Sequence, residues 1–501
     1  MGKLKQLVSQ TAVYGLSSII GRLLNYFLVP LYTHVFLPSE YGIVTEMYTY
    51  VTFLMILLTY GMETGFFRFS KIESDSDKVY STALGSLFVS SFVFVFLGLL
   101  FSHNIADILG YSNHSYYVSM FVIILGIDAF VSIPFARLRQ QNKAIKFAVY
   151  KLINIFTNIF LNLFFILWLP SLAEKISIFS AIYSSDFGVG YVFLSNLIAS
   201  VVSLLLFVPD FCGIKFKFDS KLLKSMLIYS LPLVVSGLAG MINEFFDRIS
   251  IKFFYTIPIG VTDANTFVMS ELGIYGANTK IAILMTLFVQ CFRYAADPFF
   301  FSQVGSKDFN KVFADVNKYL VAFGMFIFLG IMCYIDIVKY FIAPSYWEGL
   351  KVVPMLLLGH LLVGMVYLQS FWYKIKNLTQ YGIVIFLIGS FITIILNYFL
   401  VPRFGYIACA FANLCCYSVM FLITFIWGKK YLPCNYDYKK ILFYILFAFI
   451  LYFCTFLISP LELHIKLALN TLLIIIYCGS VLKLEGGFKI FKQLKQKFLK
   501  K

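Results

Sequence analysis

Apolar stretches of about 20 residues recur along the whole 501-residue chain, and they limit its possible folds more than any other feature. A helix needs about 20 mostly apolar residues to cross the hydrocarbon core of a bilayer. Charged residues make up 13% of the chain, about half of the roughly 25% typical of a soluble protein. The sequence therefore predicts an all-α integral membrane protein with about fourteen transmembrane helices. We expect these spans at 12–32, 42–64, 79–101, 117–136, 147–169, 187–209, 226–255, 272–300, 318–341, 352–373, 381–401, 405–427, 441–459 and 465–482.

The positions of Lys and Arg predict the orientation of the chain. With a cytoplasmic N-terminus, the cytoplasmic segments hold most of the 40 basic residues, whereas the outer loops hold Lys175, Lys351 and Arg403. Both termini are then cytoplasmic, and the net charge of +16 needs no nucleic acid to explain it. The polar start at 1–10 lacks a small-residue cleavage site, so we expect a retained first helix. The tail at 488–501 is either a helix on the anionic inner leaflet or a basic tail that serves topology alone.

The second half of the chain resembles the first. Short motifs match in the same order at offsets of 231 to 235 residues, and one at 217: 39–43 with 270–274, 69–80 with 301–313, 161–164 with 396–399, and 187–197 with 404–414. Six spans separate equivalent positions, and this even number gives both halves the same orientation. Parallel repeats of this kind are typical of transporters that rock two lobes around a central site. We expect an N-terminal lobe at 1–210, a C-terminal lobe at 211–430, and two further helices with a basic tail at 431–501.

Charged side chains inside predicted spans mark candidate functional residues, because each costs at least ~2.5 kcal/mol at the bilayer centre unless it faces a cavity or a partner. They concentrate in spans 1, 2, 7 and 8, which predicts a polar cavity between the lobes. The expected substrate-binding residues are Arg22, Asn25, Glu46, Asn243, Asp247, Arg248 and Lys280. The expected coupling or gating residues are Asp128, Glu244, Arg293 and Asp297. For Glu244–Arg248 and Arg293–Asp297, a structural ion pair is an equal alternative, and Asp128 either relays a coupling cation or caps a neighbour.

The motifs of several enzyme classes are absent from the sequence. It contains no phosphate-binding GxxxxGK[ST] or GxGxxG loop, no HExxH metal pair and no GxSxG elbow. The nine Cys residues show neither CxxC nor Cys/His ligand spacing, so no metal site or disulfide framework is expected. No segment between spans is long enough for a catalytic domain. We therefore predict transport without a cofactor, driven by a proton, sodium or the membrane potential, and no enzymatic activity.

Two groups of segments resemble a known family. Residues 16–30, 38–42 and 60–69 look like the start of bacterial polysaccharide flippases in the multidrug/oligosaccharidyl-lipid/polysaccharide exporter superfamily. Residues 246–248, 272–280 and 292–300 resemble the second half of the same family. The resemblance implies two six-helix lobes around a cationic cavity, two extra C-terminal helices and alternating access.

In function, the resemblance implies a monomer in the bacterial inner membrane that moves undecaprenyl-pyrophosphate-linked oligosaccharide from the cytoplasmic to the periplasmic leaflet. Arg22 and Arg248 would contact the pyrophosphate, and Lys280 aligns with a lysine of the family. Membrane lipids and polysaccharide-assembly enzymes are the expected partners. The alternatives are a lipid II flippase, whose relatives carry more cavity arginines, and a cation-coupled multidrug exporter, whose relatives usually stop at twelve helices. A membrane scaffold without transport would leave the buried charges without a purpose.

Overall fold

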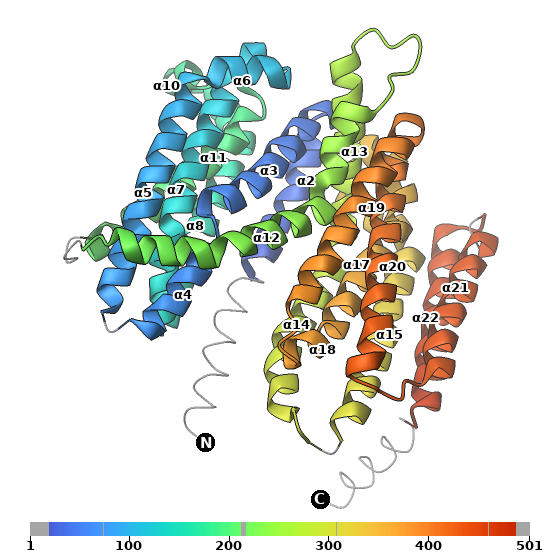
Figure 1. The fold of residues 1–501 in the computed structure, drawn as a ribbon. Coiled ribbons are helices and arrows are strands. Elements are labelled where there is room, and N and C mark those ends of the chain that lie inside the picture. The colour runs from blue at the N-terminus through green and yellow to red at the C-terminus, as the bar shows by residue number, and fades with distance from the viewer. Residues whose placement is uncertain (1–19, 74, 212–216, 307, 459, 487–501) are drawn as a thin grey trace, which may run out of the picture. The chain divides into compact units, whose positions relative to one another are not determined.

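The computed structural model describes residues 20–486 except 74, 212–216, 307 and 459, and the regular elements of this part are helices (Figure 1). Besides a helical stretch at 20–26, the longer helices are α2 (Leu28–Val35), α3 (Pro38–Thr59), α4 (Met62–Ile72), α5 (Ser76–Leu100), α6 (Ser102–Leu109), α7 (Ser115–Gln140), α8 (Ala144–Leu163), α11 (Gly190–Phe211), α12 (Ser220–Phe254), α13 (Ala264–Ile281), α14 (Ile283–Gln303), α15 (Phe309–Cys333), α17 (Val353–Gln369), α19 (Gln380–Phe404), α20 (Tyr406–Tyr431), α21 (Tyr438–Ile458) and α22 (Leu463–Leu484). Short helical segments are η1 (Ser112–His114), η2 (Phe164–Trp168), α9 (Leu169–Ala173), α10 (Ser177–Ile182), η3 (Ser185–Phe187), α16 (Ile335–Val338), η4 (Lys339–Phe341), η5 (Pro344–Val352) and α18 (Phe371–Ile375).

The described helices agree with the predicted membrane spans. Twelve segments are long and apolar enough to cross a membrane, and the pair α13–α14, bent by 47°, makes a thirteenth. Each of these segments coincides with one predicted span. The remaining prediction, 12–32, begins outside the described residues. The protein is therefore a multi-pass, all-helical membrane protein, as expected.

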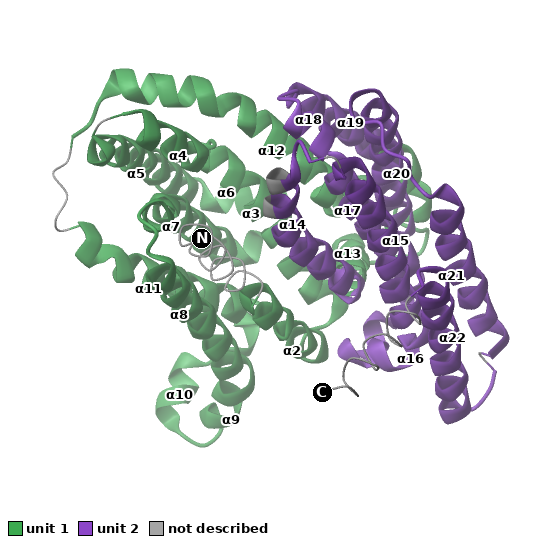
Figure 2. Cartoon of the chain, turned by 90° about the horizontal axis from the view of Figure 1, so that it is seen from below, with its two compact units in different colours: residues 1–277, 397–406 green, residues 278–396, 407–501 purple. Residues whose placement is uncertain are grey.

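The described chain forms two compact units (Figure 2). Unit 1 comprises residues 1–277 and 397–406, and unit 2 comprises residues 278–396 and 407–501. These units do not follow the predicted lobes, because α12 and most of α13 pack with the helices that precede them in the chain. The two lobes and their parallel repeat remain predictions.

Local backbone rules set the start and end of α3. Pro38 occupies its first turn, where a missing N–H costs nothing, and the Glu40 carboxylate accepts a hydrogen bond from the Leu37 N–H at 2.8 Å. At its other end, Tyr60 and Gly61 both adopt left-handed backbone angles, with φ of 35° and 69°. This left-handed pair ends α3 and starts α4 in a new direction. The predicted span 42–64 is therefore a broken helix.

A buried apolar cluster holds α4, α5, α7 and α12 together in unit 1. Phe66, Leu87 and Met226 are all fully buried within it, and Ile133 joins them from α7. Such side chains form a close-packed core. Figure 1 shows α12 running across the other helices of this cluster rather than along them.

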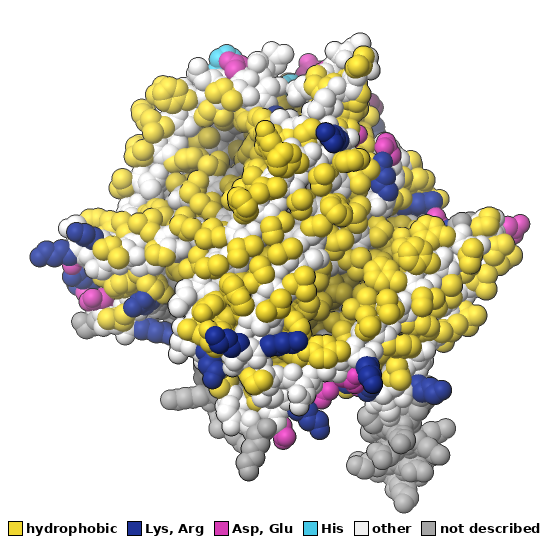
Figure 3. Space-filling view, turned by 45° about the vertical axis from the view of Figure 1, so that its right-hand side comes forward, with side chains coloured by type: hydrophobic (Ala, Val, Ile, Leu, Met, Phe, Trp, Pro, Cys, Tyr) yellow, Lys and Arg dark blue, Asp and Glu magenta, His cyan; other side chains and the backbone are white. Residues whose placement is uncertain are grey.

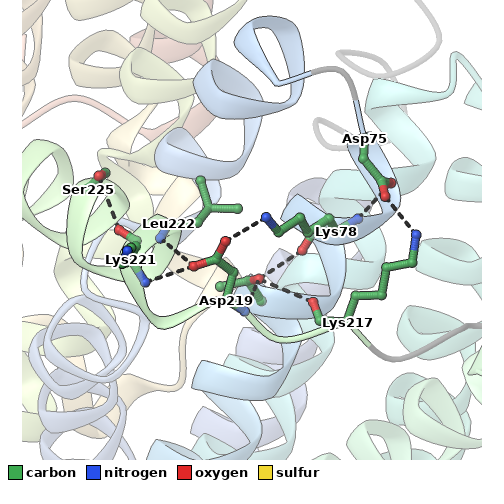
Figure 4. Close-up of polar contacts among 8 residues, drawn as sticks. Asp75, Lys78, Lys217, Asp219, Lys221, Leu222 and Ser225 are labelled. Carbon is green, nitrogen blue, oxygen red and sulfur yellow. Dashed lines mark hydrogen bonds and ion pairs between the residues drawn. The ribbon is translucent and has the colours of Figure 1, made fainter.

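Two aspartates at helix starts fasten the beginning of α12 to the beginning of α5 (Figure 4). Asp75 caps α5 and pairs with Lys217 at 2.8 Å, whereas Asp219 caps α12 and pairs with Lys78 at 2.5 Å. Each aspartate thus satisfies free N–H groups at the start of its own helix and binds a lysine at or just before the start of the other helix. The hydrogen bond from Lys78, aided by amides of the first turn of α12, lowers the pKa of Asp219 to about 2. These contacts fix where α12 enters the bundle.

In unit 2, α21 and α22 attach to α15. The Tyr477 hydroxyl donates to the Ala322 carbonyl at 3.0 Å, and the Asn470 amide donates to the Cys333 carbonyl at 2.6 Å. Beyond the end of α22, Glu485 accepts hydrogen bonds from Lys318 at 2.7 Å and from Tyr444 at 2.7 Å. Partial burial raises the pKa of Glu485, but these donors and Lys440 outweigh it and lower the pKa to about 2. The two C-terminal helices are therefore attached to α15 within unit 2.

The surface fits a lipid environment. Hydrophobic side chains cover most of the face in Figure 3. On α5, Phe88, Phe92 and Phe96 are each more than half exposed, and their four-residue spacing puts them on one side of the helix. A soluble protein rarely exposes apolar area of this extent.

Candidate functional site

Three glycines let α3 and α13 cross in close contact within unit 1. A Cβ atom at Gly42 would overlap the Met269 carbonyl oxygen, and one at Gly273 would overlap the Pro38 carbonyl oxygen. One turn further along α13, a Cβ atom at Gly276 would overlap the Thr45 side chain. Small residues allow membrane helices to approach this closely. Gly42 and Gly273 are the matched glycines of the repeat motifs at 39–43 and 270–274, so the two equivalent motifs touch each other.

Glu46 lies one turn further along α3 from this crossing and is 2% exposed. Its carboxylate accepts hydrogen bonds from the Tyr50 hydroxyl at 2.6 Å, from the Lys252 ammonium at 2.6 Å and from the Tyr111 hydroxyl. Lys252 also donates to the Leu109 carbonyl at 2.5 Å. A carboxylate with three donors is well satisfied in a buried site. We call Glu46, Tyr50, Tyr111 and Lys252 the Glu46 cluster.

A second polar group lies about one turn from Lys252 on α12. Asp247 and Arg248 have side chains that are 6% and 12% exposed, and an Arg248 nitrogen lies 3.4 Å from an Asp247 oxygen. The other Asp247 oxygen accepts a hydrogen bond from the Tyr275 hydroxyl of α13. Arg248 also donates to the Glu244 backbone oxygen at 3.1 Å and stacks on the Phe245 ring. The expected helical neighbours Glu244 and Arg248 are thus in contact, through the backbone of Glu244.

An apolar cavity of about 540 Å³ adjoins the Glu46 cluster inside unit 1. Side chains of α3, α5, α6, α7 and α12 line it, among them Leu97, Phe121 and Leu125. Tyr50 belongs both to the lining and to the Glu46 cluster, so its ring faces the apolar space while its hydroxyl bonds the carboxylate. The Glu46 carboxylate, with its hydrogen bonds already made, therefore lies at the edge of an apolar cavity that suits a hydrocarbon chain.

The other predicted site residues lie in different surroundings. Arg22 and Asn25 are exposed on the helical stretch at 20–26, Asn243 is buried on α12, and Lys280 is half-buried at the end of α13. Of the predicted coupling residues, Glu244 and Arg293 are exposed, and Asp128 and Asp297 are half-buried. In unit 2, the Arg293 guanidinium lies 4.0 Å from the centre of the Tyr367 ring. In unit 1, Asp128 interacts with Ser200 of α11 and Lys151 of α8.

Unit 1 thus holds Glu46, Asp247 and Arg248 in two separate polar groups: Glu46 of α3 bonds Lys252 of α12, and Asp247 pairs with Arg248 on α12. Lys252 lies within the predicted span 226–255, but sequence reasoning did not assign it to the site. It missed Tyr50 and Tyr111 altogether. A buried carboxylate in span 2 requires a cationic partner, and Lys252 was available at the matching end of span 7. No pattern pointed to Tyr111, which lies in a connection between helices.

Comparison with known protein families shows which family the chain belongs to. The model of the family described as "Polysaccharide biosynthesis protein" matches residues 7–303, more than half of the chain. The chain belongs to this family. This member of the polysaccharide biosynthesis family has a fold also seen in solved transporters. The lipid II flippase MurJ, in an inward closed conformation, superposes with a TM-score of 0.72 at 16% identity, covering 93% of this chain and 98% of that one.

Two further solved structures share the fold. An inward-facing multidrug resistance MATE transporter of the MOP superfamily gives a TM-score of 0.63 at 14% identity, covering 82% of this chain and 94% of that one. A MOP superfamily transporter from Pyrococcus furiosus gives 0.51 at 14% identity, covering 84% and 96%. No curated protein matches the sequence. At these identities the likeness shows the fold alone, and that fold is the one expected from the resemblance.

Proposed function

We propose that this protein moves an undecaprenyl-pyrophosphate-linked oligosaccharide from the cytoplasmic to the periplasmic leaflet by alternating access. The observation that carries the proposal is the family match over residues 7–303, made by a chain whose fold resembles flippases and exporters. A polysaccharide biosynthesis protein built almost entirely of membrane helices contributes to that process most simply by transport. The bilayer is a barrier to a sugar chain carried on a lipid, since its polar groups cannot enter hydrocarbon unpaired.

Cationic side chains on the predicted cavity helices would hold the pyrophosphate. Arg22 is exposed, and Arg248 is paired with Asp247 through a long contact of 3.4 Å, so an anion can compete for its guanidinium. Lys280 would add a third positive charge. Bidentate hydrogen bonds between guanidinium groups and phosphate oxygens are strong and specific.

The crossing of α3 and α13, together with the Glu46 cluster, would close the outer end of the path. Close backbone packing at Gly42 and Gly273 leaves no space for a sugar between these helices. The buried Glu46–Lys252 pair would then have to open, or to move as a unit, in each cycle. The apolar cavity beside it is compatible with a cargo that carries a hydrocarbon tail. Asp128, Glu244, Arg293 and Asp297 remain proposed coupling residues, with a proton, sodium or the membrane potential as the energy source.

A lipid II flippase is the second candidate, because MurJ gives a TM-score of 0.72 over 93% of this chain. It differs from the first in the sugar and peptide carried on the same lipid pyrophosphate. The mechanics would be the same. A comparison of cargoes therefore separates the two.

Purified protein in liposomes tests the proposal when three fluorescent cargoes are offered separately. They are undecaprenyl-pyrophosphate oligosaccharide, lipid II and a lipophilic cationic dye. An added quencher reaches cargo in the outer leaflet of the vesicle but not cargo in the inner leaflet. We expect the protein to exchange the first cargo between these leaflets faster than it exchanges in protein-free vesicles. Movement of lipid II alone would assign the protein to the second candidate. Movement of the dye alone would make it a multidrug exporter and overturn the proposal.

A further inference from the structure

A polar cavity of about 230 Å³ lies within unit 1, and its lining residues are separate from those of the Glu46 cluster. It is formed where α7 and α11 end and where α5 and α8 begin. These helix ends lie on the side that the distribution of basic residues predicts to face the cytoplasm. The residues lining the cavity are Tyr80, Pro134, Arg137, Leu138, Gln141, Lys143, Phe207, Pro209 and Asp210.

Two cations line this cavity in different ways. The Arg137 guanidinium lies 4.1 Å from the centre of the Tyr80 ring and bonds the exposed Asp77 carboxylate at 2.6 Å, so its plane is held in place. Lys143 is exposed, and no ion pair involving it occurs among the residues that the structure describes. The cavity therefore has one oriented guanidinium and one ammonium available to a ligand.

The carboxylate that lines the cavity is already neutralised. Both oxygens of Asp210 accept hydrogen bonds from Lys146, at 2.6 and 2.8 Å. Arg137, Lys143 and Lys146 thus face two carboxylates, Asp77 and Asp210, which leaves one positive charge at the cavity. A phosphodiester carries one negative charge and would bring the group to neutrality.

The start of α8 adds to the attraction for an anion. This 20-residue helix begins at Ala144, directly after Lys143, and no side chain in the described part of the chain caps its first turn. Its free N–H groups carry partial positive charge. On the other side, Leu138, Phe207 and Pro209 give the cavity an apolar wall, which suits the glycerol part of a lipid better than it suits a fully hydrated ion.

We infer that this cavity binds the phosphate headgroup of an anionic phospholipid from the leaflet at this end of the bundle. Basic pockets between membrane helices on the cytoplasmic side are suited to such headgroups. The volume of about 230 Å³ accepts a headgroup but not an oligosaccharide. The cavity lies in unit 1, and its lining residues are separate from the proposed cargo-binding residues, so lipid binding there is independent of the transported cargo.

Native mass spectrometry of the full-length protein, titrated with phosphatidylglycerol or phosphatidylcholine, tests this inference. Lys143→Glu is the test variant, because Lys143 is exposed and its replacement breaks no described ion pair. Lys224→Glu is the matched control, since Lys224 is exposed near the start of α12 and does not line the cavity. We expect one tightly held phosphatidylglycerol, bound at least about tenfold more weakly by Lys143→Glu and unchanged in Lys224→Glu. Asp210→Asn frees the Lys146 ammonium from its carboxylate partner and should strengthen binding.

Three results would overturn the inference. Equal weakening by both lysine variants would show a diffuse attraction of charged lipid to the surface. Equal retention of phosphatidylcholine would show that the anionic charge is not recognised. Displacement of the bound lipid by millimolar inorganic phosphate or glycerol phosphate would show that the cavity takes a soluble phosphate in place of a lipid.

Discussion

The buried ion pair between Glu46 and Lys252 gives the most quantitative prediction for unit 1. The two side chains are 3% and 10% exposed and lie 2.6 Å apart, although 206 residues separate them in sequence. Removing one partner of a buried pair costs ~3–5 kcal/mol, because the remaining charge is left without compensation. Glu46→Leu should therefore be strongly destabilising, since it leaves the Lys252 ammonium with the Leu109 carbonyl and the Tyr111 ring as its described partners and with no described counter-charge.

In thermal unfolding, 1 kcal/mol corresponds to about 2 °C for a domain of more than about 200 residues. We therefore expect Glu46→Leu to melt ~6–10 °C below the wild type in detergent. Lys252→Met should cost less, because the Glu46 carboxylate keeps its two tyrosine donors. The double variant Glu46→Leu/Lys252→Met removes both charges and should regain most of the loss, since apolar replacement of a buried pair is often neutral.

Glu348→Ala provides the matched control for this cycle. Glu348 pairs with Lys351 at 3.1 Å, but both side chains are substantially exposed, at 66% and 45%. An exposed pair contributes about 0–1 kcal/mol, so this variant should melt close to the wild type. If the double variant lost as much stability as the two single variants together, the charges would not be coupled. The account of the Glu46 cluster would then be wrong.

Two further predictions concern the helix crossing and the end of α22. Gly42→Ala should destabilise the protein by ~1–3 kcal/mol, the usual cost of overpacking, because its Cβ would overlap the Met269 carbonyl oxygen. Gly240→Ala is the control and should leave stability unchanged, because a Cβ at Gly240 meets open space. Melting curves of the two variants, recorded in parallel, test this difference. Glu485→Gln should melt below the wild type at pH 7. The depressed pKa of Glu485, about 2, means that its stabilising effect is present above the ordinary value of 4.5 and is lost as the pH falls toward 2. The difference between wild type and Glu485→Gln should therefore shrink below pH 4.5, and a difference that grows in acid would contradict the assignment.

The spans could be predicted because each carries its own signal. An apolar run of about 20 residues identifies a membrane helix without reference to the rest of the chain. Thirteen predicted spans therefore coincide with described segments. The break between α3 and α4 at Tyr60 and Gly61 was not predicted. Spans were predicted from hydropathy, and the hydropathy of a residue gives no sign of a left-handed backbone angle. The short helix α6 was missed for a related reason, since its 8 residues are too few to form a span.

The candidate site could be predicted only in part, because its contacts join distant segments. The cost of burying charge singled out Glu46, Asp247 and Arg248 as residues that need partners or a cavity, and the structure gives each of them a polar partner. It could not show that Lys252 bonds Glu46, or that Tyr275 bonds Asp247. Aromatic residues are frequent in this chain, so no tyrosine stood out as a hydrogen-bond donor. Spacing along a helix predicted the nearness of Glu244 and Arg248, but not that the contact uses the backbone of Glu244.

The most direct test of the proposed transport compares translocation of undecaprenyl-pyrophosphate oligosaccharide by wild type, Arg22→Ala and Lys351→Ala in the same liposomes. Arg22 is the exposed cation proposed to hold the pyrophosphate, and Lys351 is an exposed cation paired with Glu348 outside the proposed path. Loss of one charge-assisted hydrogen bond to the cargo should slow transport at least about tenfold. We predict this tenfold slower transport for Arg22→Ala at an unchanged melting temperature. Lys351→Ala should transport the cargo at the wild-type rate. Wild-type protein that moves the cargo no faster than empty vesicles would contradict the proposed transport of this lipid.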